Sequence, residues 1–205
     1  MKAGLTAFIY SPAEADIIET ALTLARPWDC DGVGEIKARI KAFHLHFGGQ
    51  VCCYCYRDVQ GEFSMVLDIE HILPKRHYKP LTFDIRNLSV ACKRCNMKMK
   101  RDDIDFLRLP TTIADLENGS NYRFVHPNID DRDQHLVRIV MQINTKKLVK
   151  YVVVGASEKG QFGYTYFRLD EFEIDSFDAA QGANQVSINE MNAVSSIRAL
   201  VKEIE

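Results

Sequence analysis

Two cysteine pairs with identical spacing place the strongest constraint on how this 205-residue chain can fold. Cys52 pairs with Cys55 and Cys92 pairs with Cys95, each with two residues between them. A C-x-x-C turn presents two thiolates to one ion, and two such turns complete the tetrahedral shell that zinc prefers. The spacing therefore predicts a structural zinc site that ties two distant segments together.

Alternatives to this ligand set stay open at the level of sequence. The cysteines could form a redox pair, although that leaves the second identical spacing unexplained. Cys53 could replace Cys52 through a less usual one-residue spacing. Cys30 has no partner at ligand spacing, and we expect it to pack as a small apolar side chain.

Composition excludes several other classes of protein. A hydrophobic content of 46% and a charged content of 26% are ordinary for a soluble globular protein and unlike a disordered or collagen-like chain. No apolar run approaches the roughly 20 residues that span a bilayer. The first residues make a poor signal peptide, because Glu14 and Asp16 directly follow a short apolar stretch. We expect a cytoplasmic protein with reduced thiols and no membrane contact.

Helices are predicted before the first cysteine pair. Ser11–Glu14 combines an N-cap, a proline and a capping-box glutamate, and opens a helix that runs to about residue 25. A second helix is expected over 34–47, because apolar residues recur on one face and two glycines follow. His44 and His46 lie in its last turn, where interaction with the helix dipole is favoured over metal binding.

After Pro110 the pattern changes to short alternating segments. Strands are expected over 136–143, 148–154 and 162–169, joined by turn-forming residues. Ser187–Glu190 forms a further capping box, which opens a C-terminal helix with an apolar stripe. The stripe is more typical of core packing than of a groove for a partner.

Between the cysteine pairs lie residues suited to phosphodiester hydrolysis. His71 can take a proton from water near neutral pH. Glu70 and Asn96 offer a carboxylate and an amide oxygen, which are donors suited to Mg²⁺ or Mn²⁺. Because neighbours on a strand point to opposite faces, Glu70 and His71 could share one site only if a bend or bulge interrupts the strand expected over 66–72.

The same segment carries a local excess of positive charge. Between residues 70 and 101 nine basic residues are opposed by Glu70 and Asp84 alone, whereas the whole chain has a net charge of −2. Such an island suits a phosphate backbone, although a solvated face would also account for it. The expected phosphate contacts are Lys75, Arg76, Lys93, Arg94, Lys98 and Lys100. His77 either joins them or is a loop residue.

In this order the residues resemble the HNH endonucleases of the ββα-metal (His-Me finger) superfamily. The resemblance covers about residues 51–103 and rests on three stretches, Glu70–Pro74, Asn87–Leu88 and Cys92–Asn96. It implies that His71 is the general base and that Glu70 and Asn96 bind the catalytic Mg²⁺ or Mn²⁺. It implies further that Asn87 pins the loop and helps to orient His71, and that the four paired cysteines hold structural zinc.

The chain departs from the commonest family pattern at two positions. The residue before the histidine is often Asp, and the longer Glu70 leaves room for Asp68 to share the metal-binding role. The family often has Lys three residues after the asparagine, where this chain has Met99. Which lysine contacts phosphate therefore stays open.

A second, shorter resemblance lies beyond this block. His126–Asp131, followed by His135, is similar to segments that follow the HNH block in some prokaryotic defence nucleases. These include the nuclease subunit of Septu-type antiphage systems, which works with an ATPase. The resemblance implies a role in antiviral defence with such a partner. An acidic loop in which His135 caps a strand explains the same residues.

The sequence thus predicts an α+β protein in which a zinc-stapled ββα finger lies between N-terminal helices and a C-terminal antiparallel sheet with a helix. The expected domains are a helical lead-in over 1–49, the finger over 50–110, and an extension over 111–205 that is a candidate partner interface. The expected function is metal-dependent hydrolysis of DNA. Two alternatives remain, namely a zinc module that binds nucleic acid or protein without catalysis and an effector nuclease restrained by a partner. The joint presence of Glu70, His71 and Asn96 favours catalysis.

Overall fold

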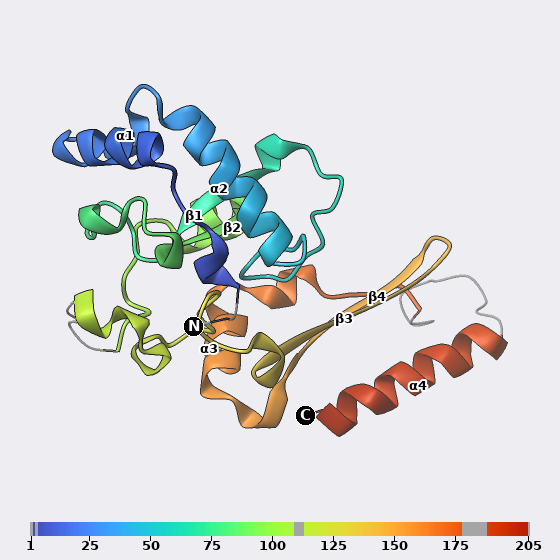
Figure 1. Cartoon of the computed structure of the whole chain (residues 1–205). Coiled ribbons are helices and arrows are strands. Elements are labelled where there is room, and N and C mark those ends of the chain that lie inside the picture. The colour runs from blue at the N-terminus through green and yellow to red at the C-terminus, as the bar shows by residue number, and fades with distance from the viewer. Residues whose placement is uncertain (1, 3, 109–112, 178–187, 205) are drawn as a thin grey trace. The chain divides into compact units, whose positions relative to one another are not determined.

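Residues 2, 4–108, 113–177 and 188–204 are described by a computed structural model, in which the chain divides into two units (Figure 1). Unit 1 contains residues 1–121 and 126–130, and unit 2 contains residues 122–125 and 131–205. The predicted N-terminal helices and the predicted finger both belong to unit 1. The mixture of helices with small antiparallel sheets confirms the α+β class.

The two predicted N-terminal helices are present in unit 1. α1 (Pro12–Thr23) begins with the predicted capping box, since Ser11 Oγ accepts from the Glu14 amide at 3.3 Å and Glu14 Oε2 accepts from the Ser11 amide at 2.7 Å. α2 (Val33–Phe47) follows Gly32, whose φ of 85° is a left-handed conformation that favours glycine. These local signals fix where both helices begin.

Next to α2 lies a two-stranded antiparallel sheet of β1 (Leu67–His71) and β2 (Leu88–Cys92) (Figure 1). The contact between helix and sheet is apolar, because Ile36 and Ile40 of α2 form a buried cluster with Leu88, against which Ile69 packs. Burying each such side chain contributes about 2 kcal/mol. This cluster ties the N-terminal helices to the strand that ends in His71.

The third element of the finger is a π-helical segment, Arg94–Lys100. The amide of Arg101 donates to the carbonyl of Asn96 at 2.8 Å, which is the wider i to i+5 bond of a π-helix. Arg101 itself has a φ of 56°, and this left-handed residue ends the segment. The helix predicted from Asn96 onward is therefore present, but its winding is π rather than α.

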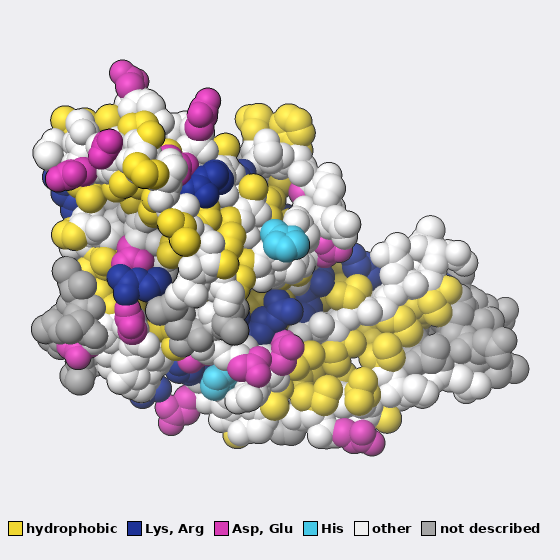
Figure 2. All heavy atoms as spheres, viewed as in Figure 1, with side chains coloured by type: hydrophobic (Ala, Val, Ile, Leu, Met, Phe, Trp, Pro, Cys, Tyr) yellow, Lys and Arg dark blue, Asp and Glu magenta, His cyan; other side chains and the backbone are white. Residues whose placement is uncertain are grey.

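Unit 2 is built on a β-hairpin of β3 (Leu136–Ile143) and β4 (Lys146–Val153), with β5 (Ile174–Asp175) beside β4. Hydrophobic side chains gather over this hairpin on the face drawn in Figure 2. α4 (Ile188–Ile204) contributes Ile197 to a cluster with Leu148 and Phe177, so at this residue the stripe packs against the core. Ser187 and its expected cap lie outside the described residues.

The strand predicted over 162–169 is wrong. This part of the chain forms α3 (Glu158–Tyr166) and then a 3-10 turn, Leu169–Phe172. Ser157 caps the helix by accepting from the Gly160 amide at 3.1 Å, and the rings of Phe162 and Tyr166 stack at 5.3 Å. Aromatic residues at 162, 164 and 166 suit an alternating strand, but 162 and 166 also share a helix face, and the N-cap selected the helix.

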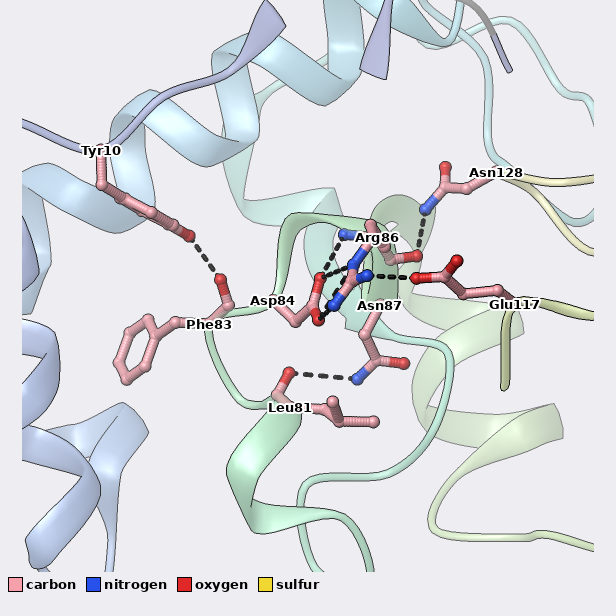
Figure 3. A network of polar contacts seen from close by, with 8 residues as sticks. All are labelled: Tyr10, Leu81, Phe83, Asp84, Arg86, Asn87, Glu117 and Asn128. Carbon is pink, nitrogen blue, oxygen red and sulfur yellow. Dashed lines mark hydrogen bonds and ion pairs between the residues drawn. The ribbon is translucent and has the colours of Figure 1, made fainter. Parts of the chain in front are cut away.

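The segment His126–Asp131 has a structural role. The Asn128 side-chain amide donates to the Arg86 carbonyl at 2.8 Å (Figure 3). It also donates to the Leu88 carbonyl at 2.8 Å, and so holds the chain where it enters β2. His126 Nδ1 accepts from the Asn128 amide at 3.1 Å. His135, in unit 2, contacts Ser157 Oγ through its Nδ1 at 2.7 Å. These contacts give the residues of the motif a structural role that does not require a partner protein.

His44 corrects another expectation. Its side chain is buried in the last turn of α2, and its Nε2 has no hydrogen-bond partner in the described part of the chain. Burial lowers the pKa of His44 to about 4, so the imidazole is neutral at pH 7 and the expected charge–dipole interaction is absent. His46, in the same turn, is exposed.

Acid should therefore destabilise the protein through His44. Between pH 6.5 and about 4 the unfolded chain binds a proton at this imidazole and the folded chain does not. The free energy of unfolding is expected to fall by about 1.4 kcal/mol for each pH unit as the pH drops through this window. Urea unfolding from pH 7.5 to 5 should show a smaller slope in His44→Gln than in the wild type. His46→Gln is the matched control, and an unchanged slope in His44→Gln would contradict the assignment.

Candidate functional site

Four buried cysteines of unit 1 form the best-defined cluster of the site. The Sγ atoms of Cys52, Cys55, Cys92 and Cys95 all lie within 4.8 Å of one another, and Cys55 Sγ is 3.9 Å from Cys92 Sγ. Tetrahedral zinc with bonds of about 2.3 Å holds its sulfur ligands about 3.8 Å apart. The donor set and its spacing therefore fit a structural zinc ion, as the two C-x-x-C pairs predict.

The knuckle turns follow from local backbone geometry. The Tyr56 amide donates to the Cys52 carbonyl at 2.9 Å, and Tyr56 takes a left-handed φ of 55° that completes the first turn. The Cys92 amide, at the end of β2, donates to Cys52 Sγ at 3.3 Å. The second turn thus begins where β2 ends, which brings the two cysteine pairs together.

The two remaining cysteines lie outside this cluster. Cys53 donates its backbone amide to the Val90 carbonyl at 3.0 Å, and burial raises the pKa of its thiol well above the ordinary value. A protonated thiol is a poor zinc ligand. Cys30 packs beside the apolar cluster of Ala21, Val33 and Phe83, in agreement with the expectation from sequence.

His71 ends β1 with its ring held on two sides. The ring meets the Trp28 ring edge-on at 4.5 Å between centroids, and its Nε2 lies 3.0 Å from the Thr82 carbonyl. Because a carbonyl only accepts, Nε2 carries the proton and Nδ1 is left as the basic nitrogen. Burial first, and then the charge of Lys75, lowers the pKa of His71 to about 3. The imidazole is therefore neutral at pH 7, which is the form that can accept a proton.

Asn87 holds the loop that follows His71. Its Oδ1 accepts from the Leu73 amide at 2.8 Å, while its Nδ2 donates to the Leu73 carbonyl at 3.0 Å. Nδ2 also donates to the Leu81 carbonyl at 3.3 Å (Figure 3). Its backbone carbonyl accepts from the Ile72 amide at 2.9 Å. These bonds fix the loop that carries Thr82, the partner of His71 Nε2.

A second layer of polar contacts surrounds this loop. Asp84 pairs with Arg86, which also pairs with Glu117, and Tyr10 donates its hydroxyl to the Phe83 carbonyl at 2.6 Å (Figure 3). Burial raises the pKa of Tyr10, so its hydroxyl remains a donor. The loop is therefore held from the N-terminal segment as well as from the finger.

Glu70 does not share a face with His71. The register of β1 against β2 is continuous, with Glu70 opposite Ser89 and His71 opposite Leu88, so the predicted bend or bulge is absent. The Glu70 side chain is 1% exposed, and its Oε1 lies 2.8 Å from Lys100 Nζ and 3.0 Å from the Tyr54 hydroxyl. The alternation of an uninterrupted strand points this carboxylate into the protein.

Lys100 is a further correction, because it was expected to contact phosphate. Its side chain is 1% exposed, and its Nζ donates to the His71 carbonyl at 2.9 Å in addition to pairing with Glu70. A buried ammonium with these partners cannot reach a nucleic acid. Neither the basic island nor the motif could reveal this burial.

The other predicted basic contacts are distributed around the finger. Lys75, Lys93 and Lys98 are exposed, and Arg94 is half-buried. Arg76 is exposed and lies 3.8 Å from Asp102. His77 is also exposed, in the loop after Pro74.

Asn96 lies beside Asp68 rather than beside Glu70. Its Nδ2 donates to Asp68 Oδ2 at 3.1 Å, and Lys93 Nζ lies 3.1 Å from Asp68 Oδ1. A divalent ion shared by Glu70 and Asn96 does not fit this arrangement, because the carboxylate of Glu70 is buried and already neutralised by Lys100. The sequence identified Asp68 only as a residue that could share metal binding with Glu70. The signal for Asp68 was its position two residues before Glu70 on the same strand.

Loss of one thiolate should release the structural metal. We expect Cys92→Ser to lose bound zinc and cooperative unfolding, because metal binding at such a site contributes directly to folding. Cys53→Ser is the matched control and should keep one zinc per chain, since Cys53 lies outside the cluster. Zinc per chain, measured by native mass spectrometry together with thermal unfolding, checks both. Full zinc content in Cys92→Ser, or its loss in Cys53→Ser, would contradict the ligand set.

Among the described residues no helix combines the length and the apolar character needed to cross a bilayer. No solved structure matches the chain. The Septu protein PtuB of Bacillus thuringiensis is 26% identical to it over 137 residues, which are 67% of this chain and 43% of that protein. The chain thus spans less than half the length of the curated relative that it matches.

The profile of the HNH endonuclease family matches residues 52–102. This range begins at the first cysteine of the zinc cluster and includes both strands and the π-helical segment of the finger. Residues 52–102 are therefore similar to the HNH endonucleases, and together with the four-cysteine cluster they fit an HNH endonuclease with zinc knuckles.

Proposed function

We propose that this chain is an endonuclease that hydrolyses phosphodiester bonds of DNA, with His71 as the general base. The observation that carries the proposal is the setting of His71 within the HNH domain. Its Nε2 faces the Thr82 carbonyl, which leaves Nδ1 without the proton, and its ring is held against Trp28. A base that is neutral and orientated by a third group is what deprotonation of water requires.

The chemistry of this chain's own residues follows from that geometry. Nδ1 of His71 takes the proton from the attacking water. The imidazolium that forms keeps its Nε2–H bond to the Thr82 carbonyl, which stabilises the new charge and fixes the ring. Asn87 acts through the loop, because its three side-chain bonds hold the segment that carries Thr82. Exposed lysines, above all Lys75 and Lys93, attract the phosphate backbone.

Dependence on Mg²⁺ or Mn²⁺ is part of the proposal, by similarity to the HNH family. Such an ion, when bound, would stabilise negative charge on the leaving oxygen. Asn96 is the proposed protein ligand that lies at the surface of the finger, where it is half-buried beside Asp68. We assign no step to Glu70, because its carboxylate is paired with Lys100.

The biological setting is proposed from the similarity to the Septu protein PtuB. We infer that the chain acts in bacterial antiviral defence, in the cytoplasm, as a nuclease subunit that works with an ATPase. Residues 111–205 are the proposed partner interface, because phosphodiester chemistry does not require them. Co-purification of a nucleotide-hydrolysing protein with the tagged chain from its own host would support this part of the proposal, and recovery of the chain alone would count against it.

A zinc-stapled binding module without catalysis is the second candidate function. The pairing of Glu70 with Lys100 favours it, because that pair removes one of the two expected ligands of the catalytic ion. Salt-sensitive DNA binding without cleavage in Mg²⁺ or Mn²⁺ would select this alternative.

Removal of the imidazole should abolish most of the cleavage. Nicking of plasmid DNA in Mg²⁺ or Mn²⁺ is expected to fall by about 100-fold or more in His71→Ala, which is the usual contribution of a general base. His77→Ala, in the exposed loop nearby, is the matched control and should cleave like the wild type. Zinc content should be unchanged in both variants. Equal rates for His71→Ala and the wild type would show that His71 is not the base.

Asn96→Ala should separate the catalytic ion from the structural one. We expect the Mn²⁺ concentration for half-maximal cleavage to rise about tenfold or more, which corresponds to losing about 1.4 kcal/mol of binding free energy. Zinc content and thermal stability should stay close to wild type, because Asn96 is half-buried and lies outside the thiolate cluster. A loss of zinc equal to that of Cys92→Ser would refute this division of roles.

A further inference from the structure

Two hollows of unit 1 lie on either side of Trp28. One measures about 510 Å³ and is lined by residues that include Arg26, Lys79 and Thr82. The other measures about 520 Å³ and runs along α2 and β1 to Asn96. Trp28 and Lys75 line both hollows, and the Trp28 ring contacts the His71 ring at 4.5 Å between centroids.

Basic side chains line this double hollow. We call it the basic groove and define it by six of its seven basic residues, Arg26, Lys37, Lys41, Lys75, Lys79 and Lys93; the seventh, Arg76, pairs with Asp102. Two of the three carboxylates in its walls are already engaged, Asp68 by Lys93 and Asp102 by Arg76. Over the chain as a whole acidic residues prevail, and Figure 2 shows both signs mixed on the face drawn. Basic side chains outnumber carboxylates in its walls, so the groove is a local positive site.

Half of the groove comes from the chain before the HNH domain. Lys37 and Lys41 are four residues apart on α2 and so share one face of the helix. Lys41 Nζ donates to the carbonyls of Ser64 and Leu67, both at 2.7 Å, which anchors the ammonium over the start of β1. Neither lysine pairs with a carboxylate among the residues that the structure describes. Partial burial lowers the pKa of both ammonium groups. A phosphate that approached them would raise these pKa values again, because it stabilises the charged form.

Trp28 indicates how a nucleic acid would be held. Lys37 Nζ lies 4.9 Å from the centroid of the Trp28 ring, and the Trp28 and His71 rings meet at an interplanar angle of 81°. A cation that covers the ring face leaves little room for a base to stack on it. The groove thus offers charge to the backbone and no exposed aromatic platform to the bases, which predicts binding without sequence preference.

We propose that the basic groove carries the phosphate backbone of the nucleic-acid substrate, and that Lys37 and Lys41 of the N-terminal segment make phosphate contacts beside His71. The choice of substrate class rests on the proposed nuclease function. The consequence is that the substrate site is built jointly by the HNH domain and by residues 26–41, outside the range that the family profile matches.

The test measures binding without cleavage. Fluorescence anisotropy with the full chain, in buffer without added divalent ions, gives affinity against salt for one sequence as duplex DNA, single-stranded DNA and duplex RNA. Lys37→Gln/Lys41→Gln is expected to weaken binding about tenfold or more and to reduce the salt slope by about two on duplex DNA, since each lost phosphate contact removes about one unit. Lys37→Arg/Lys41→Arg keeps the charges and should retain affinity. The three ligands show which backbone the groove prefers.

Lys147→Gln/Lys202→Gln is the matched control. Neither lysine lines either hollow, so the loss of the same two charges should change affinity less than twofold. An equal loss in this control and in the groove variant would overturn the proposal in favour of a general electrostatic field. Unchanged binding in the groove variant, with circular dichroism and zinc content like wild type, would overturn it as well.

The two proposals can fail separately. Groove-dependent binding by a wild-type chain that does not cleave DNA supports the groove and rejects the nuclease. Cleavage that depends on His71 while the groove variant binds like wild type supports the nuclease and rejects the groove.

Discussion

Four buried thiolates within 4.8 Å of one another are the constraint on which the finger depends. Sulfur atoms packed this closely repel one another as anions, and burial makes that charge still more costly unless a cation neutralises it. A bound zinc ion converts this repulsion into the free energy that closes the finger. It joins the first knuckle to the end of β2, and this join helps to set the register that places His71 opposite Leu88. The position of His71, the proposed base, therefore depends on the cysteine cluster at the other end of the two strands.

A second constraint is the buried pair of Glu70 and Lys100. An ion pair with both side chains 1% exposed is costly to desolvate and is tolerated only when further hydrogen bonds satisfy it. Here the Tyr54 hydroxyl bonds to the carboxylate, and the ammonium donates to the His71 carbonyl. The pair thus supports the backbone of His71 from within. It also explains how a chain can keep an acidic residue before the histidine without presenting that carboxylate to the site.

The N-terminal helices are part of the site. Their apolar faces pack on β1 and β2, Trp28 contacts His71, and the Tyr10 hydroxyl holds the loop at Phe83. The same helices line the basic groove through Lys37 and Lys41. Segments that flank a short domain match can therefore determine which ligands that domain can reach.

Local chemistry made much of this protein predictable from its sequence. Ligand spacing identified the zinc cysteines, the capping box located the start of α1, and the order of His71, Asn87 and Asn96 marked the finger. Each of these features depends on residues close in the chain or on a short motif. The strand predicted from alternating aromatic residues before Leu169 was wrong, because the same spacing also suits a helix. The N-cap at Ser157 decided between strand and helix.

Tertiary structure alone decided the partners of charged side chains. The sequence indicated an exposed Lys100, but in the π-helical segment its side chain pairs with Glu70. Asn96, which was expected beside Glu70, donates to Asp68 instead. Residue type shows that a charge exists, but burial and the nearest opposite charge depend on segments that are distant in sequence. The sequence by itself therefore determined the candidate zinc ligands and the candidate base, whereas folding decided which carboxylate stays at the surface and which lysines are buried. The reason is that the free energy of a charge is set by its surroundings in space.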